Sequence, residues 1–274
     1  CINPVKHYKL PVGLLNPGDP ADFILVKDLV HFEVSSTYIN GELVAENGIS
    51  KINSVPITAI NNFDCKKIKP AILVVPENEY PNKNGLIPVI EALDGQLITN
   101  KLMLTGSLQN GNWVTDTSND ILKIVVVNRY HLAPIAKAFI KNFGFKNGAI
   151  ASSVAHDSHN IVAVGVDDAS IAAAINLVIE AQGGVSVVSG ANNSAVNNPN
   201  SLVLPLPVAG LMSSADGFEV ADKYTTIDLA AKALGSKLQA PFMTLSFMAL
   251  LVIPHLKLSD KGLFNGDDFN FDIF

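Results

Sequence analysis

The chain has 274 residues, of which 48% are hydrophobic, and it carries a formal net charge of -6. That length and apolar content suffice for one large domain or two moderate ones, which excludes a disordered protein. The acidic balance, without a stripe of basic residues, argues against a nucleic-acid partner, because binding to phosphates needs clustered cations that displace counterions.

The sequence also bears on compartment. Cys1 and Cys65 are far apart and form no Cys-x-x-Cys pair, which indicates a reducing, cytoplasmic location. The apolar run 242–254 is interrupted by Thr244 and Ser246 and is too short to span a bilayer, so we expect no membrane partner. The chain starts with Cys rather than Met and shows no signal pattern, so we expect a fragment or a processed product.

Residues 1–60 carry short β signals at 22–26, 32–34, 37–39 and 43–44. The pair Asn40-Gly41 is typical of a two-residue hairpin turn. We therefore predict a small β domain here. Four prolines lie between residues 54 and 84, and residues 61–84 are predicted to be a loop-rich linker.

Residues 85–274 alternate between strand-like and helix-like segments. We predict strands at 121–127, 161–166, 185–188 and 202–206, and helices at 133–143, 169–182 and 226–234. Asp167 and Asp168 are suitable caps for the helix at 169–182, and the asparagine-rich stretch 189–200 is predicted to be a solvated loop. The fold class is therefore α/β, with α+β also compatible: a small β-sandwich-like tail followed by an α/β domain.

The densest group of chemically active side chains is His156-Asp157-Ser158-His159. It lies between apolar segments, so we expect it at a strand end or tight turn near a sheet edge. His156, Asp157 and His159 could ligate a divalent metal if the segment turns, because on a regular strand the two histidines would face opposite sides. Alternatively, Asp157 and Ser158 close an Asx-type turn and the group is structural.

A second group, Asn128-Arg129-Tyr130-His131, follows the strand 121–127, at a strand end where α/β sheets often contact ligands. The structural alternative is a capped turn into the helix near Pro134, with Arg129 in a surface ion pair. Cys65 has no His/Asn arrangement around it and should be an inert thiol. Neither a Gly-x-Ser-x-Gly elbow nor a phosphate-binding loop is present.

Two sets of motifs resemble known families. The segment Asn3-Pro4-Val5-Lys6-His7-Tyr8, with residues 13–23 and 41–48, resembles the tail of amidohydrolase-superfamily enzymes, where the chain leaves a metal-bearing barrel and returns to a small β domain. Residues 127–131, 151–160, 204–213 and 256–263 resemble the C-terminal part of the bacterial adenine deaminase family. The likeness covers almost the whole chain.

This resemblance implies hydrolytic deamination of adenine to hypoxanthine and ammonia in purine salvage, by a metal-activated hydroxide. It implies a manganese, iron or zinc ion, bound mainly by the TIM-type barrel. No His-x-His pair occurs in the 274 residues, so that barrel is expected to be absent and the chain alone inactive.

We therefore expect residues 1–60 to end the barrel and form the β domain, and residues 85–274 to form the C-terminal α/β domain. Arg129, His131, Ser153 and Asn160 are candidates for contacting substrate or closing the active site, and His156, Asp157 and His159 remain candidate metal ligands. Adenine, the barrel domain and further copies of the chain are the implied partners. A non-catalytic scaffold or oligomerisation module, or an amidohydrolase acting on another cyclic amide or amidine, is the alternative.

Overall fold

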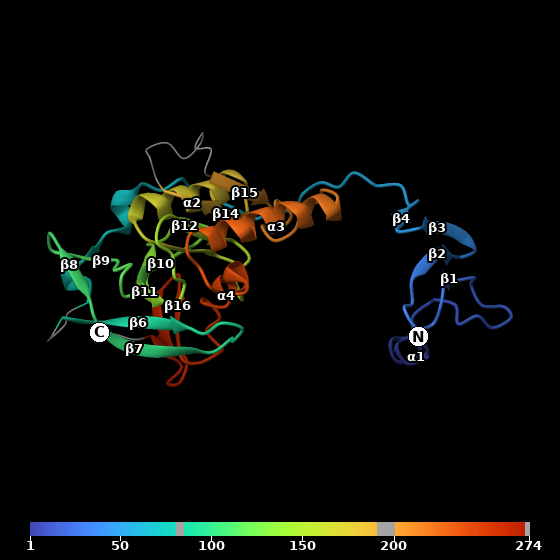
Figure 1. Ribbon diagram of the computed structural model, residues 1–274, viewed down its shortest axis with the longest axis horizontal. Coiled ribbons are helices and arrows are strands. Elements are labelled where there is room, and N and C mark those ends of the chain that lie inside the picture. The colour runs from blue at the N-terminus through green and yellow to red at the C-terminus, as the bar shows by residue number, and fades with distance from the viewer. Residues whose placement is uncertain (81–84, 191–200, 272–274) are drawn as a thin grey trace. The chain divides into compact units, whose positions relative to one another are not determined.

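The computed structural model describes residues 1–80, 85–190 and 201–271, and the chain divides into two compact units, Cys1–Ile57 and Thr58–Phe274 (Figure 1). The predicted loop at 189–200 falls almost wholly outside the described ranges. Within them, no helix combines the length and the apolar character needed to cross a membrane.

The first unit is a short helix followed by a β meander. Helix α1 (Ile2–Tyr8) precedes β1 (Phe23–Val26), β2 (Val34–Ile39), β3 (Glu42–Glu46) and β4 (Ile49–Ser50), which pair antiparallel in chain order. The turn between β2 and β3 is Asn40-Gly41, and both residues have positive φ (51° and 81°), as a type I′ hairpin requires. The predicted hairpin is confirmed.

This first unit has no core of its own. None of residues 1–57 is buried, although Phe23 and Tyr38 stack with ring centroids 4.6 Å apart. Its large apolar side chains with exposed fractions above one half include Leu15, Leu29, Val30, Phe32 and Ile49. A single small sheet without a covering layer is marginally stable in water, so this surface needs another layer.

The second unit is built on an eight-stranded sheet. Its strands, in spatial order, are β15 (Ser201–Pro205), β14 (Gly184–Val188), β12 (Ala149–Ser152), β13 (Ile161–Gly165), β10 (Ile121–Val127), β11 (Ala136–Lys141), β6 (Leu86–Ala92) and β7 (Thr99–Thr105). Strands β11 and β6 pair in parallel, whereas the other neighbours pair antiparallel. The α/β class is confirmed, and no closed barrel occurs in the described part of the chain.

Layers cover both faces of this sheet. One face carries α2 (Asp168–Glu180), which contacts β12, β13 and β14, and the opposite face carries α3 (Gly217–Ala233), α4 (Pro241–Ser246), β16 (Leu256–Ser259) and β17 (Gly262–Asn265). Strand alternation divides the core: Val125 and Val127 belong to the α2 side, while Ile124 and Val126 belong to the other. Burial on both faces explains why β10 reads as one continuous apolar run.

Short elements complete the second unit. They are η1 (Pro70–Leu73), β5 (Val75–Pro76), η2 (Glu77–Glu79), β8 (Ser107–Gln109), β9 (Asn112–Val114) and β18 (Asn270–Phe271). Two lysines of the large sheet hold the proline-rich segment in place: Lys123 Nζ donates to the carbonyl of Leu73 (2.9 Å), and Lys137 Nζ donates to that of Val74 (3.0 Å). Lys123 also forms an ion pair with Asp168.

Several predicted elements are confirmed and one is wrong. Strand β10 has the predicted bounds, and α2 begins after Asp167, whose carboxylate accepts a hydrogen bond from the backbone N–H of Ser170 (2.7 Å). The helix predicted at 133–143 is instead strand β11, because this segment fills the position between β10 and β6 and buries Phe139 and Ile140 there. The helix predicted at 226–234 is the last part of α3, which starts earlier, at Gly217.

Candidate functional site at the ends of strands β10 and β12

Asn128 organises the turn that follows β10. Its side chain is buried; Oδ1 accepts from the backbone N–H groups of Tyr130 (2.9 Å) and His131 (3.3 Å), and Nδ2 donates to Asp260 Oδ2 (2.8 Å). The first two bonds make an Asx turn, which directs the chain into β11 rather than into a helix. The third fixes a carboxylate that lies 132 residues further along the chain.

Arg129 is the only arginine in the chain and is 3% exposed. Its guanidinium donates to five oxygens: His159 O (2.6 Å), Ala209 O (2.8 Å), Tyr130 Oη (3.0 Å), Asn61 Oδ1 (3.1 Å) and Asn62 O (3.2 Å). The expected surface ion pair is wrong, because the side chain is buried and no carboxylate of the described residues pairs with it. Arg129 therefore joins three loops through main-chain and neutral side-chain oxygens.

The turn holding His156 to His159 joins β12 to β13, two inner strands of the sheet, so it lies at a strand end but not on an edge strand. Its backbone is tightly held. Tyr130 Oη donates to Ser158 O (2.7 Å), Arg129 Nε donates to His159 O (2.6 Å), and His156 N donates to Ser246 O (2.9 Å). Contacts from the turn after β10 therefore fix the shape of this turn.

The two imidazoles lie side by side. The His156 ring stacks on Phe247 (5.1 Å between centroids, 21° between planes) and meets the His159 ring edge-on at 5.7 Å. Burial, with smaller contributions from the charges of His156 and Arg129, lowers the pKa of His159, so its ring is neutral at neutral pH. Within the described ranges, the buried His159 Nδ1 has no hydrogen-bond partner.

These residues do not form a ready metal centre. No three His, Cys, Asp or Glu side chains gather into a metal-binding group in the part of the chain that the structure describes, and Asp157 is exposed. The neutral imidazole of His159 has the donor chemistry that a divalent metal prefers, but the set around it is incomplete. Metal ligation by His156, Asp157 and His159 therefore stays a prediction.

Ser153 and Asn160 are buried and serve the same framework. Ser153 Oγ donates to Gly210 O (2.6 Å) and accepts from Gly184 N (2.8 Å), and Asn160 Oδ1 accepts from Arg129 N (3.3 Å). Gly210 has φ of +71°, and a Cβ added there would lie 2.6 Å from Arg129 Nη1. We call the turn from His156 to His159 the histidine turn. The structure brings Arg129, Ser153 and Asn160 together behind it, where they fix the backbone of neighbouring loops.

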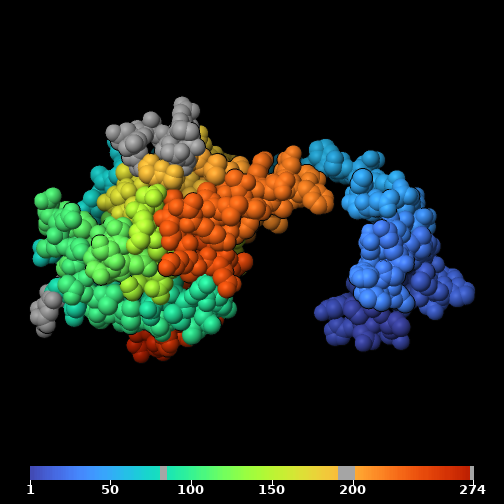
Figure 2. Space-filling view, in the orientation of Figure 1, coloured from blue at the N-terminus to red at the C-terminus, as the bar shows by residue number. Residues whose placement is uncertain are grey.

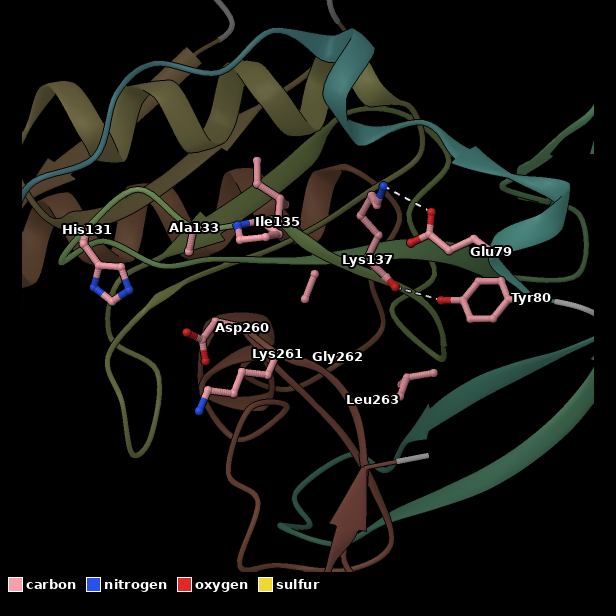
Figure 3. Close-up of a pocket in the computed structure, with 12 residues that line it drawn as sticks. Glu79, Tyr80, His131, Ala133, Ile135, Lys137, Asp260, Lys261, Gly262 and Leu263 are labelled. Carbon is pink, nitrogen blue, oxygen red and sulfur yellow. Dashed lines mark hydrogen bonds and ion pairs between the residues drawn. The ribbon is translucent and has the colours of Figure 1, made fainter. Parts of the chain in front are cut away.

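His131 is exposed and lies apart from this framework, at the rim of a pocket of about 620 Å³ (Figure 3). The pocket lies between the residues leading into β11 and the turn joining β16 to β17. Its walls are residues 133–137, Glu79, Tyr80 and residues 260–263. A second pocket, of about 390 Å³, shares five lining residues with it: His131, Ala133, Pro134, Ile135 and Lys137. Leu132, which is 88% exposed, lines only this second pocket.

Sequence reasoning singled out Arg129 and His131 but missed what Asn128 and Asp260 do. An asparagine after a strand is typical of an Asx turn, so this role of Asn128 could have been predicted. Its contact with Asp260 could not, because nothing in the neighbouring sequence indicates it. The stacking of Phe247 on His156 could not be predicted from the sequence either. For Cys65, burial raises the pKa of the thiol to about 11, in agreement with the expected inert cysteine.

Comparison with known proteins gives two family matches. The Adenine deaminase C-terminal domain family matches residues 96–270, and the Amidohydrolase family matches residues 1–44. The curated adenine deaminases of Borreliella burgdorferi, Methanosarcina acetivorans and Salinibacter ruber are 46%, 51% and 47% identical to this chain over 99%, 98% and 99% of its length. The chain spans about half the length of these relatives: 47%, 48% and 48%.

Proposed function

This chain belongs to the adenine deaminase C-terminal domain family, and from that membership we propose that it is part of an enzyme that hydrolyses adenine to hypoxanthine and ammonia. The single observation that carries the proposal is the identity of 46% to 51% to curated adenine deaminases along nearly the whole chain. Purine salvage in the cytoplasm is the setting that we propose for this reaction.

A divalent metal, manganese, iron or zinc, belongs to this proposal. When bound, it would lower the pKa of a water molecule enough to supply hydroxide near neutral pH. Because the described residues contain no group of three metal-binding side chains, we assign the metal mainly to the half of the enzyme that this chain does not match. The exposed apolar surface of residues 1–57 supports a covering partner of this kind.

For the second unit, we propose that the histidine turn closes the reaction chamber. His159 is neutral, and its ring can accept or donate a hydrogen bond, while Asp157 is exposed. Arg129, Ser153 and Asn160 hold the backbone behind this turn. In this scheme Arg129, Ser153 and Asn160 are positioning residues, and the substrate candidates are His131, Asp157 and His159.

A second candidate function is a scaffold or oligomerisation module without chemistry of its own. Helix α3 carries the exposed side chains of Phe218 and Leu229, and its first turns project from the body of the second unit (Figure 2). Exposed apolar side chains on a projecting helix favour a protein partner, including a second copy of the chain. A homo-oligomer is compatible with both candidate functions.

The test compares the 274-residue chain with the longer enzyme that contains it, each supplied with Mn²⁺, Fe²⁺ or Zn²⁺. Ammonia release from adenine is measured, and the chain alone serves as the matched control. We expect turnover by the longer enzyme and none by the chain. A metal-loaded longer enzyme that does not deaminate adenine would contradict the proposal and favour the scaffold.

A further inference from the structure

The pocket in Figure 3 has one wall whose polar groups are oriented in advance. Asn128 uses its amide N–H to hold the Asp260 carboxylate and its amide oxygen to hold the backbone of His131. One buried side chain therefore positions two pocket residues that lie 129 positions apart. Polar groups that are already held in place favour binding, because no free energy is then lost in ordering them when the ligand binds.

The polar groups on this wall have hydrogen-bonding capacity to spare. Asp260 uses Oδ2 for Asn128, while within the described ranges no partner is recorded for its Oδ1, for the Lys261 ammonium or for the His131 ring. At the other end of the pocket, by contrast, Lys137 pairs with Glu79 (3.3 Å) and its carbonyl accepts from Tyr80 Oη (2.7 Å). The capacity to bind a ligand is therefore concentrated at His131, Asp260 and Lys261.

The rest of the wall is apolar and the space is of ligand size. Ala133, Pro134, Ile135 and Leu263 line it, and about 620 Å³ lies within the usual range for small-molecule pockets. The apolar side chains offer a surface for a flat ring, and the polar wall offers one acceptor beside two donors.

We propose that this pocket binds an amino-substituted heteroaromatic base, whose amine donates to Asp260 Oδ1 and whose ring nitrogen accepts from Lys261 or His131. The choice of adenine as the base rests on the proposed function. An anion would meet the Asp260 carboxylate, and an apolar ligand would leave three polar groups without partners, at a cost in affinity. A base with an amine next to a ring nitrogen can form hydrogen bonds with both adjacent residues, because Asp260 accepts and Lys261 donates.

The experiment is calorimetric titration of the 274-residue chain with adenine and with 6-methylpurine, which replaces the amine by a methyl group. We expect adenine to bind at least about tenfold more tightly, as for a hydrogen bond to a charged group. Asp260→Asn should abolish most of this preference. The new amide oxygen can still accept the hydrogen bond from Asn128, but the new NH2 group then faces the amine of adenine, and two donors cannot bond to each other. Asp222→Asn, an exposed carboxylate on α3, is the matched control and should change nothing.

Ala133→Phe is a second variant, which fills the pocket from a half-buried position in its lining and should weaken the binding of both ligands. Equal affinity for the two purines, or adenine binding that survives both Asp260→Asn and Ala133→Phe, would overturn the proposal. Adenine deamination by the longer enzyme is measured in parallel. Turnover there without binding by the chain would overturn the pocket assignment alone, and binding without turnover would overturn the proposed reaction alone.

Discussion

Arg129 Nε donates to the carbonyl oxygen of His159 over 2.6 Å, so the only arginine of the chain holds the backbone of the histidine turn. Replacing Arg129 by Lys keeps the charge but removes the planar fork that reaches several oxygens. We expect Arg129→Lys to lower the free energy of unfolding by about 2 to 4 kcal/mol, because carbonyls of three loops lose their donor. Urea denaturation of the chain measures this, and a loss within experimental error would show that the loops hold without Arg129.

A substitution at Gly210, which lies against the Arg129 guanidinium, tests the role of Arg129 without changing that residue. Gly210→Ala places a methyl group 2.6 Å from Arg129 Nη1 at a φ of +71°, so we expect a loss of about 2 kcal/mol or more. Gly217→Ala is the control, because nothing lies within 4 Å of a Cβ there. If Gly210→Ala acts through Arg129, its effect and that of Arg129→Lys are not additive in the double variant.

Lys257 should give the chain an alkaline rise in stability. Its side chain is fully buried and donates to Leu97 O (2.7 Å) and Phe247 O (3.2 Å), and burial lowers the pKa of its ammonium to about 8. The folded protein therefore holds fewer protons than the unfolded chain above pH 8. The free energy of unfolding should rise between about pH 8 and the unfolded pKa of 10.5, by about 3 kcal/mol in the limit.

The measurement is urea unfolding of wild type and Lys257→Met at pH 7.5 and pH 10. The difference between the two proteins isolates the contribution of Lys257 from that of every group the two proteins share. We expect the variant to lack the rise, and equal pH dependence in the two proteins would show that Lys257 keeps its usual proton affinity when buried.

The histidine turn is tested in the longer enzyme that we propose to contain this chain. His156→Ala combined with His159→Ala should lower the turnover of adenine, because the two neighbouring rings and any metal ligation are removed together. His255→Ala, an imidazole paired with Asp267, is the control. Metal content is measured on the same samples. Unchanged kinetics and unchanged metal would leave the turn a purely structural role.

The two units should differ in their capacity to fold alone. Residues 58–274 contain the sheet with both covering layers, so we expect one cooperative thermal transition from that segment. Residues 1–57 contain no buried residue and should give the circular dichroism of an unfolded chain. A cooperative transition from residues 1–57 would contradict this expectation.

The sequence predicted the parts of the fold that depend on residues close together in the chain. Strand β10 is a run of apolar, mostly β-branched residues, and α2 has an aspartate cap before it and glycines after it. Strand β11 was unpredictable because Ala136–Lys141 has the composition of a helix, and its placement between β10 and β6 outweighs that preference.

The same reasoning applies to the site. The sequence placed His156 and His159 at a strand end, and their turn lies there. It could not assign Arg129 to Ala209, or Asn128 to Asp260, because these partners are 80 and 132 residues apart and meet only after the sheet forms. Burial of a lone arginine with neutral oxygens also departs from the usual exposure of that residue type.

The parallel pairing of β11 with β6 joins the β6–β7 hairpin to the other six strands through three residue pairs, whereas β6 and β7 share seven. A short ladder between two longer ones is where a sheet separates first during partial opening. Amide hydrogens of the β6–β7 hairpin should therefore exchange with solvent deuterium together, and sooner than those of β10 and β13, which makes the hairpin a cooperative subunit of the second unit.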